Sequence, residues 1–247
     1  MTRRVRISIF VPALAGFAAL LYWALVGLPD FGDYRGPYGF VLNRIVVPER
    51  HTTNVVGATV FDYRGFDTMG EELILFSAVV GVVLLLRSSG ESREEEAPTA
   101  TVRSDALRVV GTLMVGGALL VGLWLVAFGY ITPGGGFQGG VVIAGGAILL
   151  YLASSHKAFA TFGSEELLDP IDATGAGGYI VIGIAALISG LPFLRNLLGP
   201  GIPGTLWSGG SIAFLNWASA LEVAGANLIL FSEFLQEYIV PLARRQM

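Results

Sequence analysis

Long apolar runs separated by short polar segments make up most of this chain. A helix needs roughly 20 apolar residues to cross a hydrocarbon core of about 30 Å, and six runs reach or approach that length. They lie near residues 7–27, 70–87, 107–130, 137–155, 175–194 and 211–235. This pattern predicts an all-α integral membrane protein with about six transmembrane helices.

One polar stretch, "SSGESREEEAPTATVRSD" at residues 88–105, is long enough to be an exposed linker. Charged, Pro and Ser residues dominate it, and large apolar side chains are few. We therefore expect a two-helix unit over residues 1–87 and a four-helix unit over 106–247. No internal repeat accompanies this division, so a self-sufficient carrier built from inverted repeats is not indicated.

The placement of basic residues predicts the orientation of the helices. Lys and Arg accumulate in short cytoplasmic loops, and an N-terminus in the cytoplasm places ten of the fifteen basic residues on that side. We therefore expect both termini in the cytoplasm and a multi-pass protein of the cell membrane. A secretory signal peptide is the alternative for the first run, but this run is longer than the usual stretch of about 7–15 residues.

Composition excludes several kinds of site. The chain is 53% hydrophobic and 14% charged, with a mean hydropathy of +0.68, no cysteine and two histidines. Thiolate-bound zinc, iron–sulfur clusters and disulfides are therefore excluded. We expect no resident metal, no cofactor, no nucleic-acid partner and no enzymatic activity of its own.

The stretch "YITPGGGFQGGVVIAGG" at residues 130–146 concentrates glycine between two apolar runs. Its Gly-x-Gly-x-x-Gly spacing, from Gly134, follows a membrane helix rather than a strand, which argues against a dinucleotide site. We expect a tight turn in which Pro133 ends one helix and the next begins near Phe137. The predicted turn and helix-packing residues are Pro133, Gly134, Gly135, Gly136, Gly139 and Gly140. The alternative is a filter of backbone carbonyls for ions.

A smaller pattern inside that stretch predicts a contact between helices. Gly136, Gly140 and Ala144 recur at four-residue spacing, which produces a small-residue face that lets another helix approach closely.

Glu222 is the acidic residue in the middle of an apolar run. An ionisable group at that depth costs about 2.5 kcal/mol or more, so it normally faces protein or water. At helical spacing its face carries small and polar residues, namely Ser211, Ala218, Ser219, Gly225, Ala226 and Glu233. Three larger positions are expected to face lipid, namely Trp217, Leu221 and Leu228. Two roles stay open for Glu222: proton or cation handling, and a structural hydrogen bond between helices.

A second charged group precedes the run at 70–87. Its members are Asp62, Arg64, Asp67, Glu71 and Glu72. Thr68 and Glu71 have the spacing of a capping box, and Arg64 is the expected counter-ion for Asp62 or Asp67. A surface cap with ion pairs and a role in ion entry or subunit coupling are the two interpretations.

Two segments resemble known families. "GYITPGGGFQGGVVIAGGAILLYLA", together with "ALEVAGANLILFSEFL", closely resembles the MnhB domain, the B-type component of multisubunit Mrp/Mnh-type Na⁺/H⁺ antiporters. "TTNVVGATVFDYRGFDTMGEELILFSAVVGVVLLLR" resembles the C-terminal end of the large A-type antiporter component, which is a separate MbhE protein in membrane-bound hydrogenases. The two likenesses cover most of residues 52–240 and imply an MbhE-like unit fused to an MnhB-like unit.

The resemblance implies a membrane component of a cation (Na⁺)/proton antiporter complex that helps to form the ion path and the subunit interface. The implied partners are A-, C-, D-, E-, F- and G-like Mrp subunits and the lipid bilayer, with Na⁺ and H⁺ as transported ions. The implied ion-path candidates are Glu222, Glu71 and Asp67, with Arg64 as their electrostatic partner. The lysine–glutamate chain of the A-type component is missing, since the only lysine is Lys157. Two alternatives remain: a membrane component of a complex I-related oxidoreductase such as a membrane-bound hydrogenase, and a purely structural interface protein.

Overall fold

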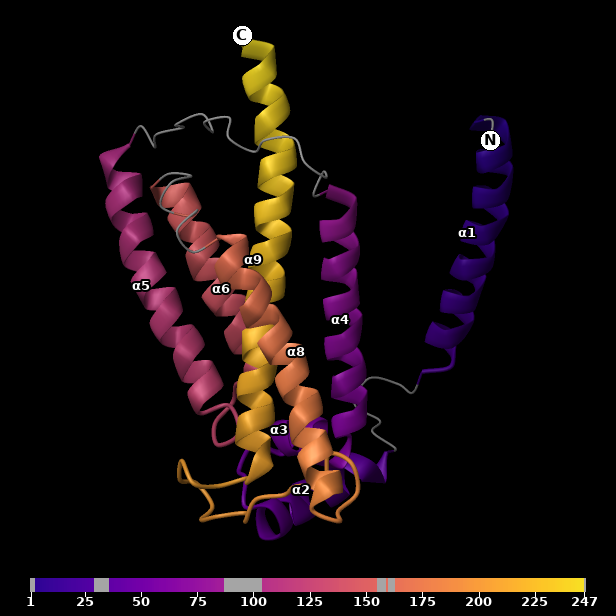
Figure 1. Cartoon of the computed structure of the whole chain (residues 1–247). Coiled ribbons are helices and arrows are strands. Elements are labelled where there is room, and N and C mark those ends of the chain that lie inside the picture. The colour runs from indigo at the N-terminus through magenta and orange to yellow at the C-terminus, as the bar shows by residue number, and fades with distance from the viewer. Residues whose placement is uncertain (1–2, 29–35, 87–103, 155–158, 160–162, 247) are drawn as a thin grey trace. The chain divides into compact units, whose positions relative to one another are not determined.

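The structure is a computed structural model that describes residues 3–28, 36–86, 104–154, 159 and 163–246. Within these residues the chain is helical, and its only strand-like pairing is an isolated bridge between Gly201 and Ser208. Six helices are long and apolar enough to cross a membrane (Figure 1): α1 (Arg3–Val26), α4 (Gly65–Leu86), α5 (Asp105–Ala127), α6 (Gly136–Ala153), α8 (Glu165–Ile188) and α9 (Ser211–Gln246). This confirms the predicted all-α membrane fold with about six spans.

The chain forms two compact units, Met1–Val41 and Leu42–Met247. In the first, α1 is apolar from Ile7 to Val26 and has no buried residue in its most apolar stretch. The predicted linker at 88–105 lies almost wholly outside the described residues, and α4 belongs to the same compact unit as α5 to α9. The division at that linker therefore stays a prediction.

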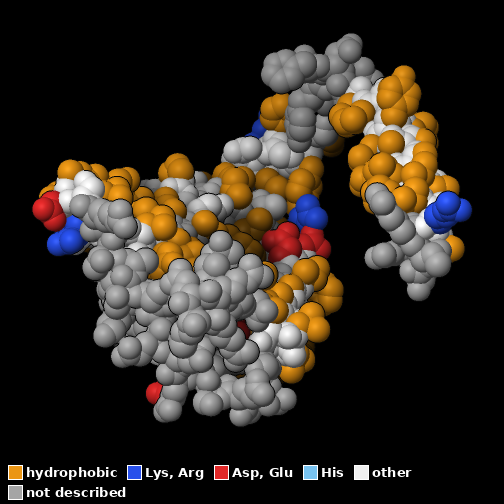
Figure 2. All heavy atoms as spheres, turned by 90° about the horizontal axis from the view of Figure 1, so that it is seen from above, with side chains coloured by type: hydrophobic (Ala, Val, Ile, Leu, Met, Phe, Trp, Pro, Cys, Tyr) orange, Lys and Arg blue, Asp and Glu red, His pale blue; other side chains and the backbone are white. Residues whose placement is uncertain are grey.

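Helix α9 is the central element of the second unit, because α4, α5, α6 and α8 all contact it. Of its most apolar stretch, 61% is buried, against 11% in α4 and in α5. The outer helices instead expose large apolar side chains such as Leu84, Leu113 and Leu120, and hydrophobic atoms cover much of the described surface in Figure 2. This distribution suits helices that surround a packed centre and face lipid or other membrane subunits.

Short helices that the apolar pattern did not predict precede α4. They are α2 (Pro37–Arg50), α3 (Val55–Ala58) and a π-helical turn, η1 (Thr59–Tyr63). Leu42 and Val46 of α2 are buried in a hydrophobic cluster with Tyr130 and Ile212. An amphipathic helix of this length is too short to span a membrane, which is why a search for apolar runs misses it.

Two boundaries differ from the prediction for a physical reason. Helix α8 begins at Glu165, ten residues before the start of the apolar run, because its first turns carry polar residues and Pro170 that a search for apolar runs leaves out. Helix α5 ends at Ala127, six residues before Pro133, so the proline does not end it. The turn that follows is closed by backbone bonds, including one from the N–H of Gly135 to the carbonyl of Leu125 at 3.1 Å.

Hydrogen bonds join three segments at the end of the bundle that carries this turn. The Thr52 hydroxyl donates to the Tyr130 carbonyl, and the Tyr130 hydroxyl donates to the Leu206 carbonyl at 2.8 Å. The His51 ring bonds the carbonyl of Gly201 in the α8–α9 loop. The segment before α4, the glycine turn and the α8–α9 loop are therefore held as one layer.

Candidate functional site

Three buried carboxyl groups lie between the two hydrophobic clusters of the second unit. Glu72 of α4, Asp172 of α8 and Glu222 of α9 are 1%, 3% and 0% exposed. On α9, Leu215 and Ala218 belong to one cluster and Ala226 and Leu228 belong to the other, with Glu222 between them. We call Glu72, Asp172 and Glu222 the carboxyl layer.

Helices α8 and α9 approach closely at this layer because each places a glycine opposite the acid of the other. A Cβ added to Gly175 would lie 2.6 Å from the Cα of Glu222, and one added to Gly225 would lie 3.1 Å from the Cα of Asp172. The same three-residue offset, acid then glycine, therefore occurs on both helices. Small residues that let helix backbones approach are a recurrent device in membrane proteins.

Glu72 and Glu222 are close enough to interact directly across the α4–α9 contact, and Ser219 lies within reach of Glu72. Among the described residues, none of the four carboxyl oxygens of this pair has a well-aligned hydrogen-bond partner. Asp172 is within electrostatic range of both glutamates. The layer is thus a set of buried acids without a basic counter-ion in the described chain.

An arrangement of this kind favours bound protons over bare charges. Two carboxylates in contact cannot both ionise at low cost, and an unpaired buried charge costs several kcal/mol. At least one proton is therefore held between Glu72 and Glu222. Buried carboxyl groups that share a proton in this way can accept and release protons.

Of the predicted ion-path residues, only Glu222 lies in the carboxyl layer. Arg64 and Asp67 form an ion pair in which Arg64 Nε donates to Asp67 Oδ2 at 2.6 Å, and both side chains are more than half exposed. Glu71 is also exposed. The predicted group before α4 is therefore divided: Asp67 and Glu71 are exposed, whereas Glu72 is buried in the carboxyl layer with Glu222.

Asp62 has a different partner from the expected one. Its side chain is 3% exposed and pairs with Arg50 of α2 rather than with Arg64. The Arg50 guanidinium also lies 4.8 Å from the Tyr63 ring centroid, and the Tyr63 hydroxyl donates to Glu49 at 2.7 Å. Burial, followed by this hydrogen bond, raises the pKa of Tyr63 to about 12. These contacts fix η1 against the end of α2.

The expected capping box does not form. Helix α4 begins at Gly65, so Thr68 lies within its first turn, and the Thr68 hydroxyl donates to the Val60 carbonyl at 2.7 Å. This bond ties α4 to η1, whose wider turn places Val60 opposite Thr68. Thr68 therefore connects two elements instead of ending one.

The glycine stretch packs against two helices. Added Cβ atoms would lie 2.2 Å from the Asn216 carbonyl oxygen at Gly136 and 2.9 Å from the Ala220 carbonyl oxygen at Gly140, both on α9. At Gly139 an added Cβ would instead lie 2.3 Å from Val126 of α5. Within Gly134–Gly140, Gly135 alone has a positive φ, of 155°. Close approach rather than backbone conformation thus explains most of these glycines.

Asn216 connects the glycine turn to α9 from both sides of the turn. Its side chain accepts from the Gly136 N–H at 2.6 Å and donates to the Val126 carbonyl at 2.6 Å. Asn54 holds the turn from the other side, donating to the carbonyls of Gly129 and Thr132 at 2.6 and 3.1 Å. The turn is therefore fixed by side chains from two distant segments.

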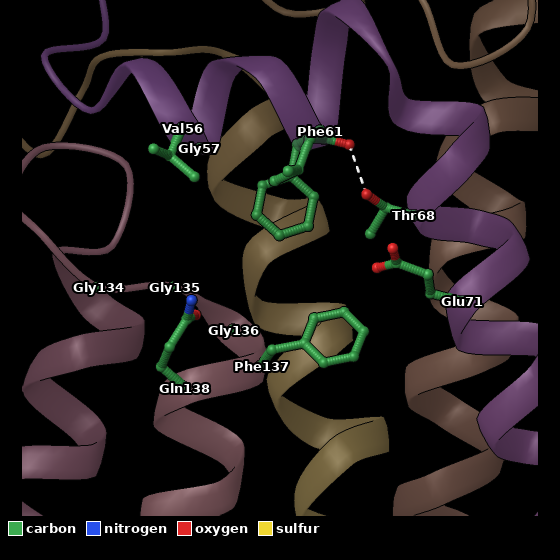
Figure 3. Close-up of a pocket in the computed structure, with 11 residues that line it drawn as sticks. Val56, Gly57, Phe61, Thr68, Glu71, Gly134, Gly135, Gly136, Phe137 and Gln138 are labelled. Atoms are coloured by element: carbon green, nitrogen blue, oxygen red, sulfur yellow. Dashed lines mark hydrogen bonds between the residues drawn. The ribbon is translucent and has the colours of Figure 1, made fainter. Parts of the chain in front are cut away.

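A pocket of about 170 Å³ lies where the glycine turn meets η1 and α4. Its lining residues are Val56, Gly57, Val60, Phe61, Thr68, Glu71, Gly134, Gly135, Gly136, Phe137 and Gln138. Figure 3 shows the Glu71 carboxyl directed from α4 into this space, towards the Phe61 and Phe137 rings. Glu71 and the glycine turn, which are far apart in the sequence, therefore share one pocket.

The residues described do not gather three or more His, Cys, Asp or Glu side chains into a group that could hold a metal ion. Sequence patterns did not single out Glu72 or Asp172 as buried acids. The shared acid-x-x-Gly spacing at Asp172–Gly175 and Glu222–Gly225 is the signal that could have found Asp172.

Comparison with known proteins identifies the family. A family model described as a domain related to the MnhB subunit of Na⁺/H⁺ antiporter matches residues 106–229. The uncharacterised protein MJ1307 of Methanocaldococcus jannaschii is 30% identical over 216 residues, covering 77% of this chain and 80% of that protein. A probable K⁺/H⁺ antiporter A/B protein of Rhizobium meliloti is 30% identical over 168 residues. That match covers 58% of this chain but only 16% of the Rhizobium protein.

Two solved structures are similar in fold. The Mrp complex from Dietzia sp. DQ12-45-1b matches 94% of this chain and 26% of its own chain, with a TM-score of 0.66 and 22% identity. The membrane-bound sulfane sulfur reductase, an archaeal respiratory membrane complex, matches 91% of this chain and 97% of its own, with a TM-score of 0.68 and 28% identity. From the family match and the Methanocaldococcus relative, this multi-pass membrane chain belongs to the family of domains related to the MnhB subunit of Na⁺/H⁺ antiporters.

Proposed function

We propose that this chain is a non-enzymatic membrane subunit of a multisubunit cation/proton antiporter, and that its carboxyl layer handles protons. The observation that carries this proposal is the contact between Glu72 and Glu222, two buried acids that face each other without a basic counter-ion among the described residues. Buried acids of this kind in spanning helices usually mark proton or ion paths. The family and the antiporter named among its relatives support the same role.

The proposal extends to the division of the chain. Glu72 lies in the MbhE-like segment and Glu222 in the MnhB-like segment, so the pair joins the two parts of the proposed fusion. The orientation with both termini in the cytoplasm belongs to the same proposal. Other Mrp-type subunits, A-, C-, D-, E-, F- and G-like, are the proposed partners, with Na⁺ and H⁺ as the proposed ions.

Asp67, Glu71 and Arg64 have a different place in this proposal. They lie at exposed positions at the start of α4, where a charged side chain must be hydrated by water or contacted by another subunit. We assign them to ion entry and subunit coupling at positions outside the buried layer.

A membrane subunit of a respiratory oxidoreductase is the second candidate. The match to the sulfane sulfur reductase complex, which covers 97% of that chain, is the observation that favours it. In that case the soluble partner subunits supply the redox energy, and this chain has the same membrane role.

Purification of the tagged chain in mild detergent separates these candidates. Antiporter subunits should co-purify, and vesicles that contain the complex should show Na⁺- or K⁺-dependent dissipation of a pH gradient. Co-purification of iron–sulfur subunits would favour the oxidoreductase instead. Recovery of the chain without partners would contradict both.

A further inference from the structure

The pocket beside the glycine turn is lined mainly by apolar side chains, and the Glu71 carboxyl and the Gln138 amide are polar groups within that lining. We propose that this pocket is an aqueous inlet through which protons reach the carboxyl layer, with Glu71 as the group that exchanges protons with the water. This inference rests on the proposed function and adds an access route and an entry residue to it.

The first step is the capacity of the pocket to hold water. A buried water needs about 10–15 Å³ of accessible space and two to four polar partners, and the pocket provides about 170 Å³. The side-chain groups in its lining that can bind water are the Glu71 carboxyl and the Gln138 amide. Several waters can therefore bind there at once.

The second step is the position of Glu71 next to the layer. Consecutive residues on an α-helix point about 100° apart, so Glu71 and Glu72 face different surroundings. Glu71 is exposed and lines the pocket, whereas Glu72 is buried and interacts with Glu222. The two neighbouring acids are also within electrostatic range of each other. Glu71 thus lies at the boundary between the pocket and the buried pair.

The third step is the rigidity of the pocket wall. Asn54 and Asn216 fix the turn through bonds to Gly129, Thr132 and Gly136. The Thr68 hydroxyl bonds the Val60 carbonyl and holds η1 to α4, as the dashed line in Figure 3 shows. Short π-helical segments of this type occur frequently at functional sites. The wall is therefore built by bonds across three segments and does not depend on loop packing alone.

The transfer conserves protons at each step. The ionised Glu71 carboxylate takes a proton from hydronium in the pocket, forming an O–H bond and leaving water. That bond then breaks as the proton passes to an ionised Glu72, which leaves Glu71 ionised again. Glu72 can accept this proton when the proton held by the pair resides on Glu222, and Glu72 passes its own proton on only after Glu222 has released the one it carries.

Cysteine accessibility tests the inlet, because the natural chain has no cysteine. The single variants Val60→Cys and Glu71→Cys each place a cysteine at a position that lines the pocket. Ile74→Cys is the control for an exposed position on the apolar part of α4, since Ile74 is 73% exposed. Thr205→Cys, in the exposed α8–α9 loop, is the positive control, because it shows whether the reagent reaches the end of the bundle that carries the glycine turn. Each variant is treated in the assembled complex, in vesicles, with a charged, membrane-impermeant methanethiosulfonate.

The inlet predicts that Val60→Cys and Glu71→Cys react within about tenfold of the rate of Thr205→Cys, because a thiol must meet water to form the reactive thiolate. Ile74→Cys should react about a hundredfold more slowly, because the apolar surroundings oppose formation of the thiolate. Val60→Cys and Glu71→Cys reacting as slowly as Ile74→Cys would overturn the inlet.

A functional test distinguishes failure of the inlet from failure of the proposed function. Val60→Phe fills the pocket and should slow proton-coupled exchange at least about tenfold, whereas Val80→Phe, on a half-exposed position of α4, should not. Wild-type exchange in an assembled Val60→Phe complex would remove the inlet while leaving the antiporter role intact. Absence of cation-dependent proton exchange in the wild-type complex would instead remove the proposed function itself.

Discussion

The backbone of Glu222 packs directly on Gly175, so that a Cβ at position 175 would lie 2.3 Å from the Glu222 backbone nitrogen. On the same pair of helices Gly225 meets Asp172 in the reciprocal arrangement. The two acids are therefore held by close backbone contact, which leaves little freedom for the helices to separate at the carboxyl layer.

The first prediction concerns this contact. Gly175→Ala should destabilise the assembled protein by about 1–3 kcal/mol, because an extra methyl group overpacks a closed interface. Thermal unfolding in detergent measures the loss. Gly177→Ala on the same helix is the matched control, since no atom lies within 4 Å of its added Cβ. Equal melting temperatures for the two variants would contradict the close contact.

A second prediction separates the two arginine pairs before α4. Arg50→Met should cost about 3–5 kcal/mol, because it leaves the buried Asp62 carboxyl without its partner. Arg64→Met should cost no more than about 1 kcal/mol, since the pair of Arg64 with Asp67 is exposed. Chemical or thermal unfolding of both variants provides the comparison, and a larger loss for Arg64→Met would show that the pairs are misassigned.

Tyr63 provides a prediction for alkaline pH. Its folded pKa of about 12 lies above the unfolded value of about 10, so the folded state holds the phenolic proton more tightly. The stability from this difference is fully present below pH of about 10 and is lost as the pH rises towards 12. Tyr63→Phe should abolish this component of the pH dependence, measured by unfolding across the range from about pH 9 to about pH 12. An unchanged alkaline profile would argue against the partly buried, hydrogen-bonded state of Tyr63.

The spanning helices could be predicted from the sequence because lipid demands long apolar runs, and Glu222 could be singled out because it interrupts one. Asp172 could not be found in the same way. It lies close to Pro170 and Asp169, and a polar segment of this kind suggests a loop. The burial of Asp172 depends on Gly225, which belongs to a different helix and is distant in the sequence.

The burial of Glu72 could not be predicted from the sequence for a related reason. Glu71 and Glu72 are the same residue type and are adjacent in the sequence, and only the packing of α4 on α9 decides which one is buried. The counter-ion of Asp62 likewise depends on α2, a helix too short to be seen as a membrane span. The burial of Asp172 and Glu72 and the ion pair of Asp62 thus depend on contacts between segments that are distant in the chain, and local sequence patterns do not contain this information.

The most direct test of the carboxyl layer is cation-dependent proton exchange in vesicles that contain the complex with Glu222→Gln. This change keeps the shape of the side chain but removes its exchangeable acid, and Glu166→Gln, at an exposed position of α8, is the matched control. We predict a fully assembled Glu222→Gln complex whose exchange is reduced at least about tenfold, with the control unchanged. Undiminished exchange by an assembled Glu222→Gln complex would contradict the proposal that the carboxyl layer handles protons.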